Sequence, residues 1–488
     1  MARAWIAPAF CCASSLAGSA LACSDLVCAP IAGCAEMVQR AAASAPRNLN
    51  GIGAGAALDA SVFNSRNVTL KSQLPLAQMG GGIGSSLYGW VDPLTSREYA
   101  IMGRSNGTAF VDITNPAQPK YVANLPMASG SFATDWREPK VFGNFAFIGV
   151  DGTNHPIQIV DLTKLRNYTG TTLQLAADRN FRGNGSTLTK AHTLAINPQS
   201  GFLYAARTDK YSGGIMAIDV RNPLNAFEAG GFSGDGITHE TQVVTYTGPD
   251  LEHRGKEIAF NSNAKTGATQ DTFSIVDVTS KSSMTRLSTQ FYLGARYIHQ
   301  GWLTEDQRYF FQNDESDESG GVTSRTRTHL WDVADLDQPV YRGYWDNATT
   351  SIDHNLYVRN GYVFETNYTT GLRVLKIGNL ASNDPEDWLE EVAYFDTYPA
   401  NDGKTFNGAW NNYPFFPSGN IAVSDIDGGL FVLRPNLPAW DATQKAFPRD
   451  RFGNIIMNAV PEPGFAMTSL LAASLLSRRW SHKANTIR

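Results

Sequence analysis

A short motif recurs along the chain and is the feature that most constrains its fold. Two apolar residues precede an aspartate, and an apolar residue and often a threonine follow it. Five copies are centred on Asp112, Asp161, Asp219, Asp277 and Asp332, at spacings of 49 to 58 residues. Two degenerate copies, Val374-Leu375-Lys376-Ile377 and Phe431-Val432-Leu433, bring the number to seven. A period of this length indicates an architecture in which one structural unit is repeated.

A second short apolar run precedes each copy of the motif. Examples are Tyr99-Ala100-Ile101-Met102, Phe145-Ala146-Phe147-Ile148 and Tyr309-Phe310-Phe311. Runs of this composition, punctuated by Gly, Asn and Pro, predict strands and hairpin turns rather than helices. Four short strands per unit of ~50 residues are typical of a β-propeller blade. The sequence therefore predicts an all-β fold, a seven-bladed β-propeller.

The last copy of the motif has no outer strand after it, because only Pro435-Asn436-Leu437-Pro438 follows before the pattern stops. Upstream of the first blade, residues 68–75 resemble the outer strand at residues 120–126. We expect this N-terminal strand to complete blade seven, which joins the ends of the ring and removes an exposed edge. The propeller is predicted to span residues 68–435.

Cysteine content and charge exclude several classes of protein. The chain has 488 residues and five cysteines, all at positions 11, 12, 23, 28 and 34. The predicted propeller therefore has no disulfide, no Cys-based zinc site and no cysteine nucleophile. The 40 basic and 45 acidic residues give a net charge of −5, so no basic footprint argues for nucleic acid as a partner.

The N-terminus has the features of a secretory signal peptide. Arg3 precedes a mostly apolar stretch, and Ala20-Leu21-Ala22 is a small-x-small cleavage signature. We expect residues 1–22 to be the signal peptide and residues 23–67 to be a linker. The linker contains Cys23, Cys28 and Cys34, an odd number of thiols for an oxidising compartment. A buried N-terminal helix and lipoprotein processing at Cys34 are the alternatives.

The C-terminus resembles a sorting signal. After a linker at residues 436–459, Val460-Pro461-Glu462-Pro463 leads into an apolar run of 13 residues and then Arg478 and Arg479. The run is shorter than the ~20 residues of a comfortable transmembrane helix, and the basic cluster would stay cytoplasmic, which places the body outside. Residues 460–488 resemble the PEP-CTERM signal, which implies processing by an exosortase-type protease. Nine residues follow Arg479, where that family usually stops sooner.

One repeated position in the innermost strand is predicted to hold the ligand-binding residues. Alignment of the blades by distance to the next turn places seven residues there: Trp90, Trp136, His192, His239, His299, His354 and Trp410. Four of the eight histidines thus occur in four consecutive blades. Because inner strands line the central channel of a propeller, we expect these rings to converge at one mouth of it.

Three interpretations of this position are open. Each histidine could hydrogen-bond a neighbouring blade and tie the ring together. The imidazoles could instead bind zinc or another divalent first-row cation with nearby carboxylates; that metal set is His192, His239, His299, His354, Glu240 and Asp353. Third, the Trp faces and His edges could form a cage for a sugar or another polar ligand.

An acidic run, Asn313-Asp314-Glu315-Ser316-Asp317-Glu318, offers oxygen ligands that suit calcium. It lacks the spacing of an EF-hand loop. We expect a solvated hairpin loop here.

The body of the chain resembles the choice-of-anchor B family, which is built from LVIVD-type propeller repeats. The resemblance extends over about residues 74–435. Segments that show it include Thr238-His239-Glu240-Thr241-Gln242, His299-Gln300-Gly301-Trp302 and Asp353-His354-Asn355-Leu356-Tyr357. Glu240 stands where relatives often have Asp. The resemblance implies a propeller displayed outside the cell and implies no established reaction.

The function predicted from these features is an exported, cell-surface or secreted binding module. Its ligand would be a protein, a polysaccharide or a metal ion, and an extracellular polysaccharide or a surface protein is the expected partner. The chain shows no nucleophile–base pair, so no catalytic residue is predicted. The alternative is a metal-dependent extracellular hydrolase or lyase with a His-lined site in the central channel and a divalent metal as cofactor.

Overall fold

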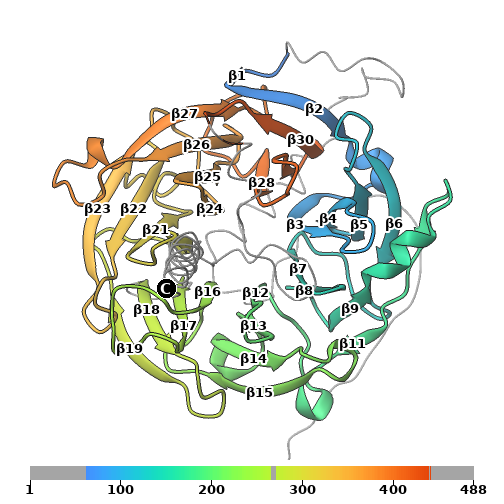
Figure 1. Ribbon diagram of the computed structural model, residues 1–488, viewed down its shortest axis with the longest axis horizontal. Coiled ribbons are helices and arrows are strands. Elements are labelled where there is room, and N and C mark those ends of the chain that lie inside the picture. The colour runs from blue at the N-terminus through green and yellow to red at the C-terminus, as the bar shows by residue number, and fades with distance from the viewer. Residues whose placement is uncertain (1–61, 265–270, 439, 441–488) are drawn as a thin grey trace, which may run out of the picture. The chain divides into compact units, whose positions relative to one another are not determined.

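The computed structural model describes residues 62–264, 271–438 and Trp440. These residues form seven small, mainly antiparallel sheets arranged in a ring (Figure 1). The all-β, seven-bladed β-propeller predicted from the repeat is therefore confirmed. Over the described residues up to 438, helix is limited to short 3₁₀ turns, of which the longest, η3 (Leu162–Asn167), has six residues.

Each blade contains four strands that follow one another from the channel outward. The innermost strands are β3 (Gly84–Val91), β7 (Arg137–Phe142), β12 (Thr193–Asn197), β16 (Glu240–Thr245), β20 (Ile298–Leu303), β24 (Leu356–Arg359) and β28 (Ala409–Tyr413). The second strands are β4 (Glu98–Arg104), β8 (Phe145–Val150), β13 (Phe202–Ala206), β17 (Glu257–Asn263), β21 (Tyr309–Asp314), β25 (Tyr362–Thr366) and β29 (Ile421–Asp425).

The seven copies of the sequence motif form the third strands. These are β5 (Gly107–Asp112), β9 (Ile157–Asp161), β14 (Ile215–Asp219), β18 (Thr272–Asp277), β22 (Arg327–Asp332), β26 (Leu372–Ile377) and β30 (Gly429–Pro435). The outer strands are β6 (Lys120–Pro126), β11 (Arg179–Phe181), β15 (Phe227–Phe232), β19 (Thr285–Gln290), β23 (Val340–Asp346), β27 (Leu389–Phe395) and β2 (Val68–Leu74). A short strand β10 (Leu173–Gln174) extends blade one by pairing with β6.

The motif aspartate ends the third strand by capping the turn that follows. In blade one, the Asp112 carboxylate accepts a hydrogen bond of 2.9 Å from the backbone N–H of Thr114. The hydroxyl of Thr114 accepts one of 3.0 Å from the N–H of Glu98, at the start of the second strand. Asp277 and Thr279 repeat both contacts in blade four. An aspartate that bonds the N–H two residues on stabilises a tight turn, which explains its recurrence.

The N-terminal strand closes the ring, as predicted. β2 pairs antiparallel with β30, with Val68 opposite Pro435 and Leu74 opposite Leu430 (Figure 1). A two-residue strand that the repeat did not predict, β1 (Ser65–Arg66), adds to the edge of β27 in blade six. Beyond β30, Trp440 is buried against Phe364, with ring centroids 5.3 Å apart.

The hydrophobic core lies between neighbouring blades. For example, Phe311 and Leu330 of blade five pack with Leu356, Val363 and Leu375 of blade six. Each blade thus buries its faces against its two neighbours in the ring.

Candidate metal centre in the central channel

Six of the seven predicted ring residues meet at one end of the channel. Trp136, His192, His239, His299, His354 and Trp410 line a single cavity there. Each of them lies at the start of an innermost strand or just before it. The histidines come from four consecutive blades because β12, β16, β20 and β24 all begin at the same end of the channel.

Trp90 is not part of this cavity, and its assignment to the ring position is wrong. It lies near the opposite end of β3, where its ring packs 5.1 Å from that of Tyr99. Ser85 and Ser86 line the cavity in blade one. The pairing of β3 with β4 shifts register between Gly84 and Leu87. β20 shows the same shift around His299 and β28 around Trp410. The bulge therefore marks the ring position in these blades, whereas the distance to the next turn does not mark it in blade one.

The four imidazoles form a continuous arc of ring contacts. Centroids of His192 and His239 are 4.6 Å apart, and those of His239 and His299 are 4.3 Å apart. His299 and His354 are also separated by 4.3 Å. Trp410 ends the arc, 5.0 Å from His354. All four histidines are buried.

The Nδ1 atoms of three histidines contact acceptors in the protein. His239 Nδ1 lies 3.0 Å from the carbonyl oxygen of His299, and His354 Nδ1 lies 2.5 Å from that of Trp410. His192 Nδ1 lies 3.0 Å from a carboxylate oxygen of Asp151. Carbonyl and carboxylate oxygens only accept hydrogen bonds, so each of these Nδ1 atoms must hold the proton. The neutral rings then present Nε2 as a lone pair.

The Nε2 atoms lie close to other ligand atoms in a pair and a group of three. Those of His192 and His239 are 2.8 Å apart. Those of His299 and His354 lie 3.7 Å and 3.6 Å from the two carboxylate oxygens of Glu315. The ligand atoms of His299, Glu315 and His354 all lie within 4.8 Å of one another. The cavity thus combines imidazole nitrogen and carboxylate oxygen, the donor set of zinc and related cations.

Burial favours the neutral form of three of these imidazoles. It lowers the pKa of His192. Burial, with repulsion from the neighbouring imidazoles and Arg207, lowers the pKa of His239 and His299 well below the usual range. Neutral imidazole is the form that binds a metal ion.

Sequence reasoning did not assign the second strands a part in this site, although they supply several of its side chains. Asp151, Arg207 and Glu315 each come directly after a second strand: β8, β13 and β21. The second strand runs antiparallel to the first, so its end lies beside the start of the innermost strand; Thr193, for example, pairs with Ala206. Polar residues immediately after the second apolar run were the signal that could have identified them.

Glu240 and Asp353, the carboxylates assigned to the metal set, lie in different places. Glu240 lines the histidine cavity, and its carboxylate lies within 4.8 Å of ligand atoms of His239 and His299. Burial and the nearby Glu138 raise its pKa to about 8. Asp353 is buried but is not among the residues that line this cavity.

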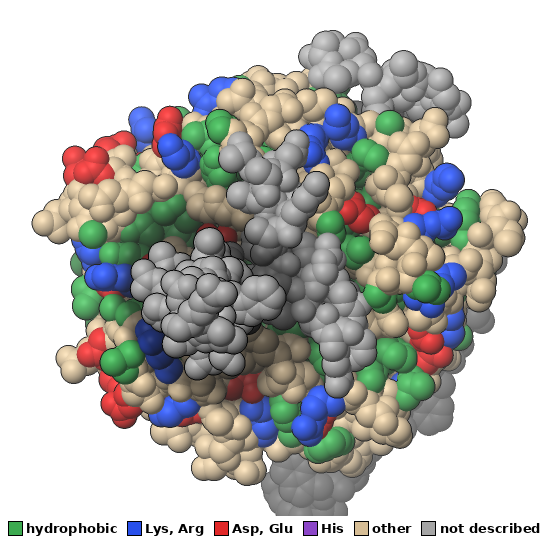
Figure 2. Space-filling model, in the orientation of Figure 1, with side chains coloured by type: hydrophobic (Ala, Val, Ile, Leu, Met, Phe, Trp, Pro, Cys, Tyr) green, Lys and Arg blue, Asp and Glu red, His purple; other side chains and the backbone are tan. Residues whose placement is uncertain are grey.

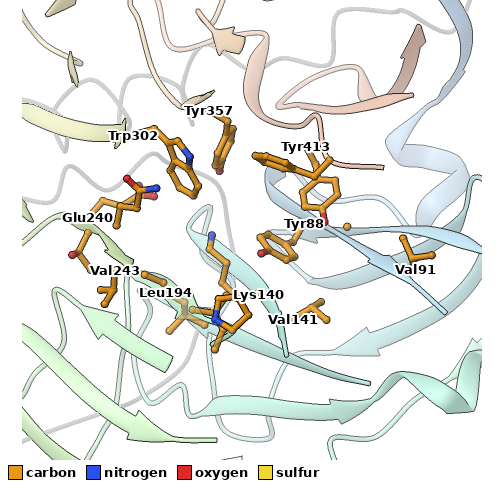
Figure 3. Close-up of a pocket in the computed structure, with 17 residues that line it drawn as sticks. Tyr88, Val91, Lys140, Val141, Leu194, Glu240, Val243, Trp302, Tyr357 and Tyr413 are labelled. Atoms are coloured by element: carbon orange, nitrogen blue, oxygen red, sulfur yellow. The ribbon is translucent and has the colours of Figure 1, made fainter. Parts of the chain in front are cut away.

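A second cavity, of about 820 Å³ with the solvent at its mouth, shares Glu240 with the histidine cavity. Figure 3 shows Tyr88, Trp302, Tyr357 and Tyr413 around it, with the Lys140 side chain extending into it. The rings of Trp302 and Tyr357 are 4.9 Å apart. Aromatic faces beside an ammonium and a carboxylate are suited to a ligand with both apolar and polar groups.

Charges on the propeller are mixed. On the face in Figure 2, Lys and Arg side chains are interspersed with Asp and Glu around the ring. Among the residues that the structure describes, no helix is long and apolar enough to cross a bilayer. The predicted signal peptide and sorting segment lie outside the described residues.

The fold and the channel define the protein as a seven-bladed β-propeller with a histidine-lined cavity at one end of the channel. No family model matches the chain, and no curated protein is significantly similar to it. In structure it is similar to hydrazine synthase of Kuenenia stuttgartiensis, with a TM-score of 0.50 and 11% identity, over 69% of this chain and 92% of that one. That likeness shows the fold alone.

The Cps50 (Swd1) β-propeller domain of Myceliophteria thermophila also matches. The TM-score is 0.44 and the identity 12%, over 75% of this chain and 98% of that one.

Proposed function

We propose that this protein is an exported β-propeller module that binds a divalent first-row metal ion at the histidine end of its channel. The ligands would be the Nε2 atoms of His192, His239, His299 and His354, with the Glu315 carboxylate. The proposal rests on the 2.8 Å separation of the His192 and His239 Nε2 atoms, both of which present lone pairs.

Two facing lone pairs repel each other unless a proton or a cation lies between them. A proton is disfavoured because burial lowers the pKa of both rings. A cation removes the repulsion, and two nitrogens bound to one tetrahedral ion at 2.0 Å would be ~3.3 Å apart. The observed separation is close to that value, so little movement would be needed.

The contacts at Nδ1 support the same conclusion. A histidine that binds a metal usually donates its other N–H to a carboxylate or a backbone carbonyl, which fixes the ring and its tautomer. His192 does so to Asp151, His239 to His299, and His354 to Trp410. All three contacts also join neighbouring blades. The structural role considered for these histidines and metal binding are therefore compatible, because the tie uses Nδ1 and the ion would use Nε2.

Metal content tests the proposal. The full chain, purified without chelators and dialysed against Zn²⁺, Cu²⁺ or Co²⁺, is expected to retain about one ion per molecule in elemental analysis. A chain that stays free of all three metals would contradict the proposal.

We further propose that the protein belongs to the choice-of-anchor B family and is sorted by a PEP-CTERM-like tail. The recurrent LVIVD-like third strands and a propeller without cysteine support this assignment. Cell fractionation of the full chain and of a variant that ends before Val460 tests it. We expect the full chain outside the cytoplasm and altered anchoring of the truncated one; a full chain that stays in the cytoplasm would contradict the export proposal.

A further inference from the structure

The acidic segment at the end of β21 is not the solvated hairpin loop expected from the sequence. Asp314, Asp317 and Glu318 are 0%, 2% and 1% exposed. Asp353 of blade six is 1% exposed, and one of its carboxylate oxygens accepts a hydrogen bond of 3.3 Å from the N–H of Asp314. Four buried carboxyl groups therefore gather where blades five and six meet.

One of the four carboxylates is fully bonded. Asp314 accepts hydrogen bonds from the hydroxyl of Tyr292 and from the backbone N–H groups of Arg296 and Tyr297, at 2.6–2.8 Å. The Asp314 carboxylate therefore needs no further ligand.

The other three have oxygens without a hydrogen-bond donor. Both carboxylate oxygens of Glu318, one oxygen of Asp317 and one of Asp353 are buried and accept no hydrogen bond from a donor outside the cluster; Glu318 hydrogen-bonds only Asp317. Burial, followed by the charges of Asp353 and Asp317, raises the pKa of Glu318 to about 12. Buried carboxylates normally are paired or coordinate a cation, because leaving them bare is costly.

Asn313, an uncharged residue at the end of β21, is a second feature of this boundary between blades five and six. Asn313 is fully buried, and neither its amide oxygen nor its amide nitrogen has a partner. Side chains alternate along a strand, so Asn313 lies on the same face of β21 as Phe311. That face packs against Leu356 and Val363 of blade six, the blade that contains Asp353.

The cations nearby do not neutralise these oxygens. Lys404 donates its ammonium protons to the backbone carbonyls of Glu318 and Thr323. His329 Nε2 lies 3.8 Å from one oxygen of Asp317, too far for a hydrogen bond.

We infer that the boundary of blades five and six holds a second cation site, for a hard divalent ion such as Ca²⁺. Its ligands would be oxygens of Asn313, Asp317, Glu318 and Asp353. Carboxylate and amide oxygens suit Ca²⁺, which takes 6–8 oxygen ligands, water included. The site is distinct from the histidine cavity and does not depend on the proposed function, although Glu315 lies in the same segment of chain.

Calcium-dependent stability tests the inference. The full chain, stripped with EGTA, is expected to bind one Ca²⁺ in equilibrium dialysis, and its melting temperature is expected to rise by roughly 5 °C or more when about 2 mM CaCl₂ is restored. The double variant Glu318→Gln/Asp353→Asn should lose this response. Its melting temperature without calcium should equal or exceed that of the stripped parent, because it replaces buried carboxyl groups, which repel one another when ionised, with neutral amides of nearly the same shape.

Two further variants make the result specific. Glu252→Gln, at an exposed position, should keep the calcium response, and so should His299→Ala/His354→Ala, whose failure to bind Zn²⁺ would concern only the histidine cavity. A parent chain that neither binds Ca²⁺ nor changes its melting temperature overturns the inference. A full response retained by Glu318→Gln/Asp353→Asn overturns it as well.

Discussion

A chain that lacks residues 62–74 is expected not to form a stable propeller. The deletion removes β2, which is the only outer strand of blade seven among the described residues. It exposes the edge of β30 and uncovers the side chains that pack on Val68 and Leu74, both buried in the intact ring. Burying Val68 and Leu74 fully and Leu70 partly contributes about 5 kcal/mol, comparable to the whole stability of many domains.

The deletion should therefore give aggregated protein, or protein without a cooperative thermal transition in circular dichroism. Lys71→Ala is the matched control: the side chain is exposed in the same strand, and its removal should change the melting temperature by no more than a few degrees. A truncated chain that melts cooperatively near the parent's temperature would show that six complete blades and three strands of the seventh suffice.

Replacing both His299 and His354 by alanine is expected to lower the affinity for Zn²⁺ at least about 100-fold in isothermal titration. The change removes two of the four Nε2 atoms proposed as ligands and leaves Glu315 without its two imidazole neighbours. Loss of a residue that only orients a metal ligand typically costs 10–100-fold, so the loss of two ligands should cost more.

His253→Ala is the control for this experiment. His253 lies in a separate group with Asp250 and Asp337 that also brings three ligand atoms within 4.8 Å of one another. Its replacement should leave Zn²⁺ affinity unchanged if the ion binds in the channel. Unchanged affinity in His299→Ala/His354→Ala together with loss in His253→Ala would move the site to this outer group. Circular dichroism of each variant checks that the propeller remains folded.

The ring and its closure were predictable because each blade is a local unit that repeats its own sequence signals. The motif aspartate caps a turn two residues away, as Asp112 does with Thr114. Residues 68–75 resemble an outer strand, and no outer-strand pattern follows residue 435. These two observations were enough to predict that the two ends of the propeller pair with each other. Such features depend on neighbours in the sequence, so they can be read without knowing the fold.

The histidine position was predictable for the same reason, but only where the blades keep the same hairpin length. Trp90 was misplaced because blade one has no glycine in the turn between β3 and β4, while the bulge at Ser85 and Ser86 retains the true register. Whether the imidazoles face the channel depends on the twist and register of neighbouring blades. The sequence of a single strand does not determine either of them.

The sequence alone thus specified seven blades, their closure and a repeated histidine position, because these follow from local patterns and their period. The direction of each Nε2, the approach of Glu315 and the burial of Glu318 beside Asp353 came only with the folded ring. Most of these contacts join side chains about 35 to 47 residues apart in the chain, and they form only when adjacent blades pack. The spacing in the sequence therefore located the candidate site, and the packing of blades determined which atoms meet there.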